Sequence, residues 1–234
     1  MSFINVPRSS RTIKTLFWIF IFAVTMAFFE SALVIYLREL YYPQGFSFPL
    51  TQVPFHIGLT EIIREACAML MVLSVAWLSG NRGMERFAFF CIIFGIWDIF
   101  YYIFLKIILG WPESFFTWDI LFLIPAVWSG PVIAPLIISI ILIIFGNTIL
   151  VFEIRTGGGT KLPVIHIALF LSGAAIVFLS FILEFLLRLN TAKPSMSIIN
   201  SVVPENFPWI PFILGITGMI SSIVLIILRN ANRA

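Results

Sequence analysis

Five carboxylates stand in or beside the long apolar runs of this sequence: Glu30, Glu61, Glu65, Asp98 and Asp119. An ionisable side chain at bilayer depth costs several kcal/mol, so it usually has a partner and often has a function. A carboxylate without enough neutralising charge takes up a proton or binds a cation. These five side chains are therefore the first candidates for a binding site.

The segment Glu61-Ile-Ile-Arg64-Glu65 places an acid, a base and a second acid at positions i, i+3 and i+4. Residues at these spacings share one face of a helix. Paired carboxylates can also act as general acid and base, and the arginine between them could bind an anionic headgroup. The motif thus allows either cation binding or acid–base catalysis.

Acid and base recur at helical spacing on two other segments. Asp98, Tyr102 and Lys106 stand at i, i+4 and i+8, and Glu30 and Arg38 are eight residues apart. These spacings bring side chains roughly into phase on one helix face. We expect each of these acids to have its cation on its own helix.

Convergence of these faces would create a polar cavity between the first three helices. The candidate ligand-binding residues are Glu30, Glu61, Arg64, Glu65, Asp98, Tyr102, Lys106 and Asp119. Five acids then face three cations (Arg38, Arg64 and Lys106), a formal surplus near two negative charges. The alternative is a structural ion-pair network that holds three helices in register.

The hydrophobic composition predicts which structural elements position these residues. The 234-residue chain is 61% hydrophobic and 11% charged, which is typical of a membrane protein. A helix needs about 20 apolar residues to cross a bilayer. We expect an all-α, polytopic transmembrane bundle, a single integral membrane domain over residues 1–234. Its six helices are expected near 15–37, 58–79, 87–109, 131–153, 163–187 and 209–228.

The distribution of basic residues predicts the orientation. With the N-terminus inside, nine basic residues lie on the cytoplasmic side, and five lie on the outer side or at outer helix ends. The nine are Arg8, Arg11, Lys14, Arg82, Arg86, Arg155, Lys161, Arg229 and Arg233; the five are Arg38, Arg64, Lys106, Arg188 and Lys193. The positive-inside rule then places both termini in the cytoplasm, in a plasma or inner membrane, and the five acids in the outer half or centre.

Residues 111–130 interrupt this pattern. The apolar piece 120–128 is too short to span, and Pro125 and Pro131 break it or follow it. Non-helical backbone at membrane depth occurs where protein encloses it. We expect a re-entrant or interfacial segment; the alternative is an ordinary outer loop.

The sequence gives little sign of a cofactor. Two histidines, His56 and His166, make bis-histidine haem ligation improbable, although quinone binding remains open. Cys67 and Cys91 fall inside expected spans, where a cysteine is usually a packing residue. The net charge of +3 comes mainly from short loops, so no nucleic-acid partner is expected.

Small residues gather on the last two expected helices. They are Ser172, Gly173, Ala174 and Ala175 on the fifth, and Gly215, Gly218 and Ser222 on the sixth. Such residues let helices approach closely, within one chain or between copies. A homo-oligomer through these faces is therefore possible.

Three functions remain open from the sequence. The first is a transporter or channel-like protein whose outward carboxylates bind a proton, a metal cation or a small cationic solute. The second is an intramembrane enzyme acting on a lipid-type substrate at the outer leaflet. The third is a structural subunit of a membrane complex in which the ion pairs are architectural. The surplus of carboxylates favours the first.

Overall fold

The computed structural model describes residues 8–157, 162–189 and 206–231, and within them six helices are long and apolar enough to cross a membrane. They are α1 (Arg8–Tyr41), α2 (Phe55–Ser79), α3 (Gly83–Leu109), α4 (Ile133–Arg155), α5 (Val164–Leu189) and α7 (Trp209–Ala231). Each expected span overlaps one of these helices. The prediction of a six-helix membrane bundle is therefore confirmed. Apolar runs of this length form helices because a helix satisfies its own backbone hydrogen-bonding groups.

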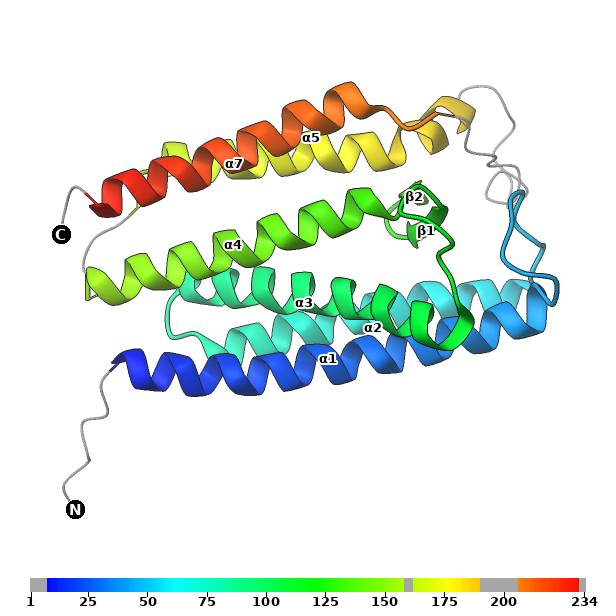
Figure 1. Cartoon of the computed structure of the whole chain (residues 1–234), viewed down its shortest axis with the longest axis horizontal. Coiled ribbons are helices and arrows are strands. Elements are labelled where there is room, and N and C mark those ends of the chain that lie inside the picture. Colours follow the sequence, from blue (N-terminus) through cyan, green and yellow to red (C-terminus); the bar gives the residue numbers. More distant parts are fainter. Residues whose placement is uncertain (1–7, 158–161, 190–205, 232–234) are drawn as a thin grey trace, which may run out of the picture.

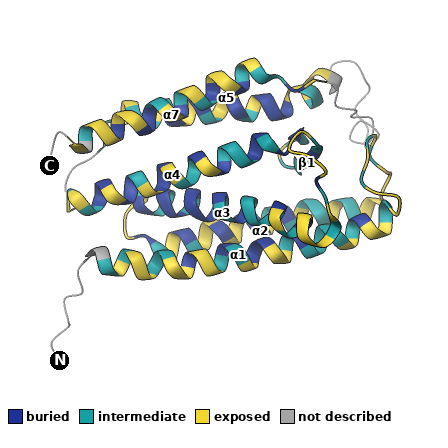
Figure 2. Ribbon diagram, viewed as in Figure 1, coloured by how far each residue is buried: buried dark blue, intermediate teal, exposed yellow. Residues whose placement is uncertain are grey.

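Helix α3 lies at the centre of the bundle, where it packs against α1, α2 and α4. Helix α4 also packs on α7, and α7 packs on α5 (Figure 1). Buried residues follow α3 along its length, whereas α1, α2, α5 and α7 present exposed apolar side chains on their outer faces (Figure 2). This is the distribution that a lipid-facing surface around a packed core requires.

Helix α1 begins and α7 ends at the same end of the bundle (Figure 1). This arrangement is compatible with two termini on one side of a membrane, but which side they occupy stays a prediction. Lys161, Lys193 and Arg233, which contribute to the orientation argument, lie outside the described residues.

The segment between α3 and α4 folds into a β-hairpin. Strands β1 (Trp118–Phe122) and β2 (Trp128–Pro131) pair antiparallel, at the end of the bundle where α3 ends and α4 begins, here termed the hairpin end (Figure 1). The hairpin enters the bundle: the Phe122 ring stacks on Phe94 of α3 at 6.1 Å. The ladder between β1 and β2 supplies partners for the backbone of this segment. Its re-entrant or interfacial position in a membrane stays a prediction.

The small residues of α5 and α7 pack against each other within the chain. A Cβ atom at Gly173 would lie 2.6 Å from the carbonyl oxygen of Gly215, so the two backbones touch. The hydroxyl of Ser222 donates to the carbonyl oxygen of His166 at 2.6 Å. These contacts use the faces that the sequence offered for oligomerisation, which stays an untested prediction.

The contact between α3 and α4 predicts a sharp effect of one methyl group. A Cβ atom at Gly95 would lie 2.5 Å from the carbonyl oxygen of Ser139, whereas one at Gly83 would meet nothing within 4 Å. We expect Gly95→Ala to destabilise the protein by about 1–3 kcal/mol through overpacking. Gly83→Ala is the matched control and is expected to be neutral or slightly stabilising. Thermal unfolding in detergent measures both, and equal midpoints would contradict the close packing.

Candidate functional site

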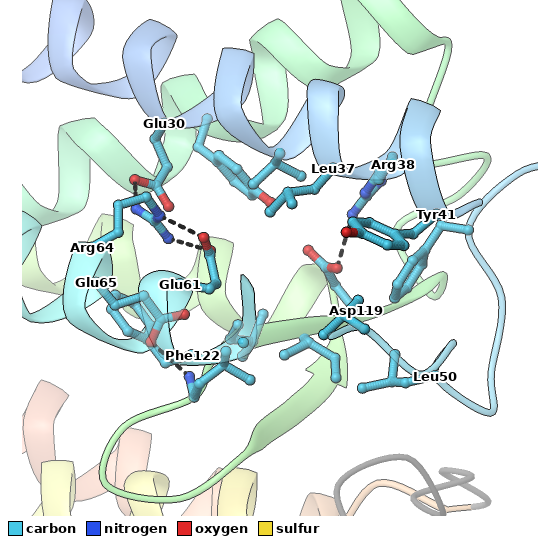
Figure 3. A pocket seen from close by; sticks show the side chains of 18 of the residues that line it. Glu30, Leu37, Arg38, Tyr41, Leu50, Glu61, Arg64, Glu65, Asp119 and Phe122 are labelled. Carbon is cyan, nitrogen blue, oxygen red and sulfur yellow. Dashed lines mark hydrogen bonds and ion pairs between the residues drawn. The ribbon is translucent and has the colours of Figure 1, made fainter. Parts of the chain in front are cut away.

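One cavity of about 220 Å³ gathers the polar residues of the first half of the chain (Figure 3). It lies between α1, α2, α3 and β1. Seven of the eight predicted site residues line it: Glu30, Glu61, Arg64, Glu65, Asp98, Tyr102 and Asp119. Lys106 is not among the lining residues; its ammonium group donates to the carbonyl oxygens of Gly110 and Pro112 at 2.9 and 2.8 Å. The structure therefore brings together every predicted site residue except this lysine.

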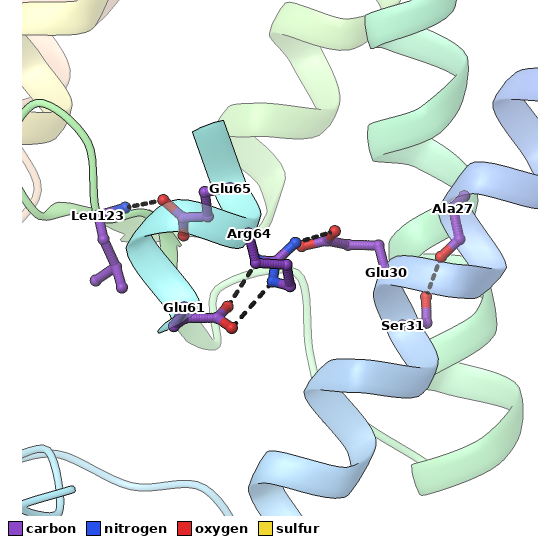
Figure 4. Close-up of polar contacts among 7 residues, drawn as sticks. All are labelled: Ala27, Glu30, Ser31, Glu61, Arg64, Glu65 and Leu123. Carbon is purple, nitrogen blue, oxygen red and sulfur yellow. Dashed lines mark hydrogen bonds and ion pairs between the residues drawn. The ribbon is translucent and has the colours of Figure 1, made fainter. Parts of the chain in front are cut away.

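Arg64 on α2 binds two carboxylates, one on its own helix and one on α1 (Figure 4). Its Nε and Nη2 atoms donate to the two oxygens of Glu61 at 2.9 and 2.6 Å, and its Nη1 atom donates to Glu30. The Glu61–Arg64 pair is the one expected from the i, i+3 spacing. The expected pairing of Glu30 with Arg38 is wrong, because Glu30 is within reach of the guanidinium on the neighbouring helix.

Arg38 instead pairs with the hairpin. Its Nη2 atom donates to Oδ1 of Asp119 at 3.0 Å, and both side chains are buried. The guanidinium lies 3.7 Å from the centroid of the Trp111 ring and 4.6 Å from that of Phe46. The Tyr102 hydroxyl donates to the other carboxylate oxygen of Asp119 at 3.3 Å. Asp119 thus fastens β1 to α1 and α3 at once.

Two carboxylates of the cavity have only neutral hydrogen-bond donors. The backbone N–H of Leu123 donates to Glu65 at 2.9 Å, and the Ser139 hydroxyl donates to Asp98 at 2.7 Å. Within the described residues, neither acid is part of an ion pair. The expected pairing of Asp98 with Lys106 is wrong, since Lys106 donates hydrogen bonds to carbonyl groups just beyond the end of α3. Glu65 and Asp98 are therefore the two acids of the cavity that no ion pair holds in the described residues.

Sequence reasoning missed the two partners of these acids. Ser139 lies on α4 and Leu123 at the hairpin tip, both remote in sequence from the carboxylates that they contact. A lone serine within the apolar run of α4 was a possible signal for the first. A backbone N–H at a hairpin tip leaves no signal in the residue type.

Of the five acids that line the cavity, Asp119 is the one that lies outside the six membrane-spanning helices. Burial raises the pKa of Asp119 to about 6 from an ordinary 3.8, and the Arg38 guanidinium acts in the opposite direction. Removal from water is the larger effect, because a carboxylate enclosed by apolar side chains loses its hydration.

Candidate metal ligands do not gather in the described part of the chain. In residues 8–157, 162–189 and 206–231, no group of three or more His, Cys, Asp and Glu side chains could hold a metal ion. His56 is exposed at the start of α2, and neither it nor His166 lines the cavity. What remains is a pocket with a surplus of carboxylates and aromatic walls.

Comparisons with known proteins return no relative. No family model matches the chain, and no curated protein and no solved structure is similar to it. The function is therefore argued from the geometry of the cavity.

Because the Arg64 guanidinium lies between Glu30 and Glu61, we expect its removal to destabilise the protein strongly. A second substitution should restore part of that stability. Arg64→Gln leaves two neighbouring carboxylates without their shared cation, and breaking such a pair from one side costs about 3–5 kcal/mol when it is buried. These groups are partly exposed (12–20%), so we expect the lower end of that range. Adding Glu30→Gln should restore part of the loss.

Thermal unfolding of the single and double variants measures this coupling. The exposed Glu39, on α1 like Glu30, supplies the control substitution Glu39→Gln, which should neither destabilise the protein nor rescue Arg64→Gln. Additive losses in the double variant would contradict the shared ion pair.

The raised pKa of Asp119 predicts a pH dependence with a definite sign. Because its folded-state pKa of about 6 exceeds the ordinary 3.8, the folded form binds the proton more tightly than the unfolded form. The stability that protonation contributes is present at low pH and is lost as pH rises through about 6. Between about pH 4 and pH 7, the midpoint of Asp119→Asn should therefore fall less than that of the unsubstituted protein. Parallel curves would contradict this assignment.

Proposed function

We propose that this membrane protein binds a small organic cation in the cavity between α1, α2, α3 and β1, as the solute-binding site of a transporter. One observation carries the proposal: five carboxyl groups and only two guanidinium groups line a single cavity, a formal excess of three negative charges. An enclosed excess of this size attracts a positively charged ligand.

Glu65 and Asp98 are the carboxylates proposed to contact the cation. Their present donors are a backbone N–H and a hydroxyl, which do not neutralise charge. Glu30, Glu61 and Asp119 already share Arg64 and Arg38. A single positive charge placed between α2 and α3 would thus reduce the excess where it is least compensated.

The walls of the cavity favour an organic cation. Phe94, Trp97, Tyr101 and Phe122 line it beside the two acids. Aromatic faces attract ammonium groups and suit the recognition of quaternary ammonium in particular. The volume of about 220 Å³ lies below the roughly 300–1,000 Å³ of drug-sized pockets, so the bound group is small. A proton alone would leave this space and these rings without a role.

One part of the enzyme alternative is less favoured. In that interpretation Arg64 could bind an anionic headgroup beside the paired carboxylates, yet Arg64 already donates to Glu61 and Glu30. A purely architectural network accounts for the two arginine-centred clusters. Glu65 and Asp98 stand outside these clusters: in the described residues each accepts a hydrogen bond from another element, but neither forms an ion pair.

Binding is tested by ligand-induced stabilisation. Methylammonium, tetramethylammonium and butylammonium are each added to the purified protein, and a ligand at 100 times its Kd should stabilise it by about 2.7 kcal/mol. We expect Glu65→Gln and Asp98→Asn to weaken the response roughly tenfold or more, as loss of a charged contact does. Glu113→Gln, in an exposed loop position, is the matched control and should respond normally. No response to any of the three ions would contradict the proposal.

Transport is tested separately in proteoliposomes. Tetramethylammonium carries a permanent charge, so it does not leak across the bilayer as a neutral amine would. We expect exchange of labelled for unlabelled tetramethylammonium in vesicles with the unsubstituted protein and with Glu113→Gln, and a loss of exchange with Glu65→Gln. Binding without any exchange would restrict the protein to a solute-binding role.

A further inference from the structure

We propose that the ligand is an amphipathic cation, whose ammonium head occupies the polar cavity and whose hydrocarbon chain lies in an apolar crevice beside the hairpin tip. This inference rests on the proposed function and names the class of its ligand. It follows from a second space in the structure that the cation site alone does not explain.

The crevice has a volume of about 310 Å³ and six lining residues, all of them apolar: Met69, Phe94, Phe122, Ile124, Pro125 and Trp128. The one polar atom of these side chains is already used, because the Trp128 indole N–H donates to the carbonyl oxygen of Ile124 at 2.9 Å. A polar solute would find no side-chain partner there. A hydrocarbon chain fits, since it needs none.

The crevice and the polar cavity are adjacent. Phe94 and Phe122 are walls of both, and their rings stack at 6.1 Å with planes 19° apart. On α2, Glu65 lines the cavity and Met69 lines the crevice. Four residues of helix correspond to about 6 Å, and side chains at i and i+4 share a face. A head beside Glu65 therefore places the first carbons of its chain beside Met69.

The crevice lies next to the lipid-facing side of α2. Leu70 and Leu73, one and four residues after Met69 in the sequence, are 60% and 49% exposed. A chain in the crevice would thus adjoin the acyl chains of the bilayer, and the ligand would reach its site sideways from the membrane. The hairpin makes both halves of the site: Ile120 to Leu123 line the polar cavity, and Phe122 to Pro125 lead into the crevice.

Photolabelling of the protein in lipid nanodiscs tests this arrangement. The probe is a dodecyltrimethylammonium ion with a diazirine in its chain, and labelled residues are located by mass spectrometry. We expect labels at Met69, Ile124 and Pro125, reduced at least fivefold by excess tetramethylammonium, which competes for the head site alone. Glu65→Gln should reduce them to the same extent.

Two further variants keep the test decisive if Glu65→Gln fails to fold. Met69→Trp fills the crevice and should abolish the crevice label while leaving the response to tetramethylammonium unchanged. Leu70→Trp adds the same bulk one residue away on the lipid-facing side and should leave the label intact.

The outcomes separate this inference from the function on which it rests. Labels at the crevice that tetramethylammonium does not displace would show a chain site unconnected to the cavity and would overturn the inference. Labels spread evenly over Leu70, Leu73 and other lipid-facing positions would overturn it as well. Stabilisation by tetramethylammonium together with either result would leave the cation site standing. A crevice label without any response to tetramethylammonium would contradict the cation site in the polar cavity. It would therefore also contradict one amphipathic ligand that occupies both spaces.

Discussion

A carboxylate enclosed among membrane helices needs a partner, and in this protein the partner usually comes from another element. Glu30 on α1 meets Arg64 on α2, Asp119 on β1 meets Arg38 on α1, and Asp98 on α3 meets Ser139 on α4. Each contact joins two segments that apolar packing alone would leave free to rotate or slide. The cost of removing these acids from water thus also helps to define the register of the segments that they join.

The hairpin is the element that depends most on this constraint. Its Asp119 is held by Arg38 and Tyr102, and the N–H of Leu123 is held by Glu65. These contacts place the aromatic side chain of Phe122 between the helices, against Phe94 and Trp97. A short segment that cannot span a membrane is thereby packed against the bundle. It supplies one wall of the polar cavity and one wall of the apolar crevice.

Hydropathy was sufficient to predict the helices, because a helix that crosses a bilayer leaves an unmistakable apolar run. Helical spacing was also sufficient to predict the Glu61–Arg64 pair, which lies within one turn. It failed for Glu30 and Asp98, where the expected partners were eight residues along the same helix. A cation two turns along the same helix is farther from the acid than a partner on a neighbouring helix. The sequence does not show how neighbouring helices are rotated, so it does not identify that partner.

The hairpin shows a second limit of sequence reasoning. Prolines and a short apolar length indicated that residues 111–130 would be re-entrant or interfacial, but not that they would pair as strands. The Glu65 contact uses a backbone N–H, which any residue at that position except proline would supply. Seven of eight candidate residues nevertheless line one cavity, because the acids of α1, α2, α3 and β1 all border the same space.

The proposed cation sits between Glu65 and Asp98. Solid-state NMR tests it directly by measuring the dipolar coupling between ¹⁵N-tetramethylammonium and ¹³C-labelled carboxyl groups of the protein in lipid. We expect coupling to one glutamate and one aspartate carboxyl carbon, with the former lost in Glu65→Gln, the latter lost in Asp98→Asn, and both retained in Glu113→Gln. Coupling only to exposed carboxylates, or none at all with saturating ligand, would contradict the account.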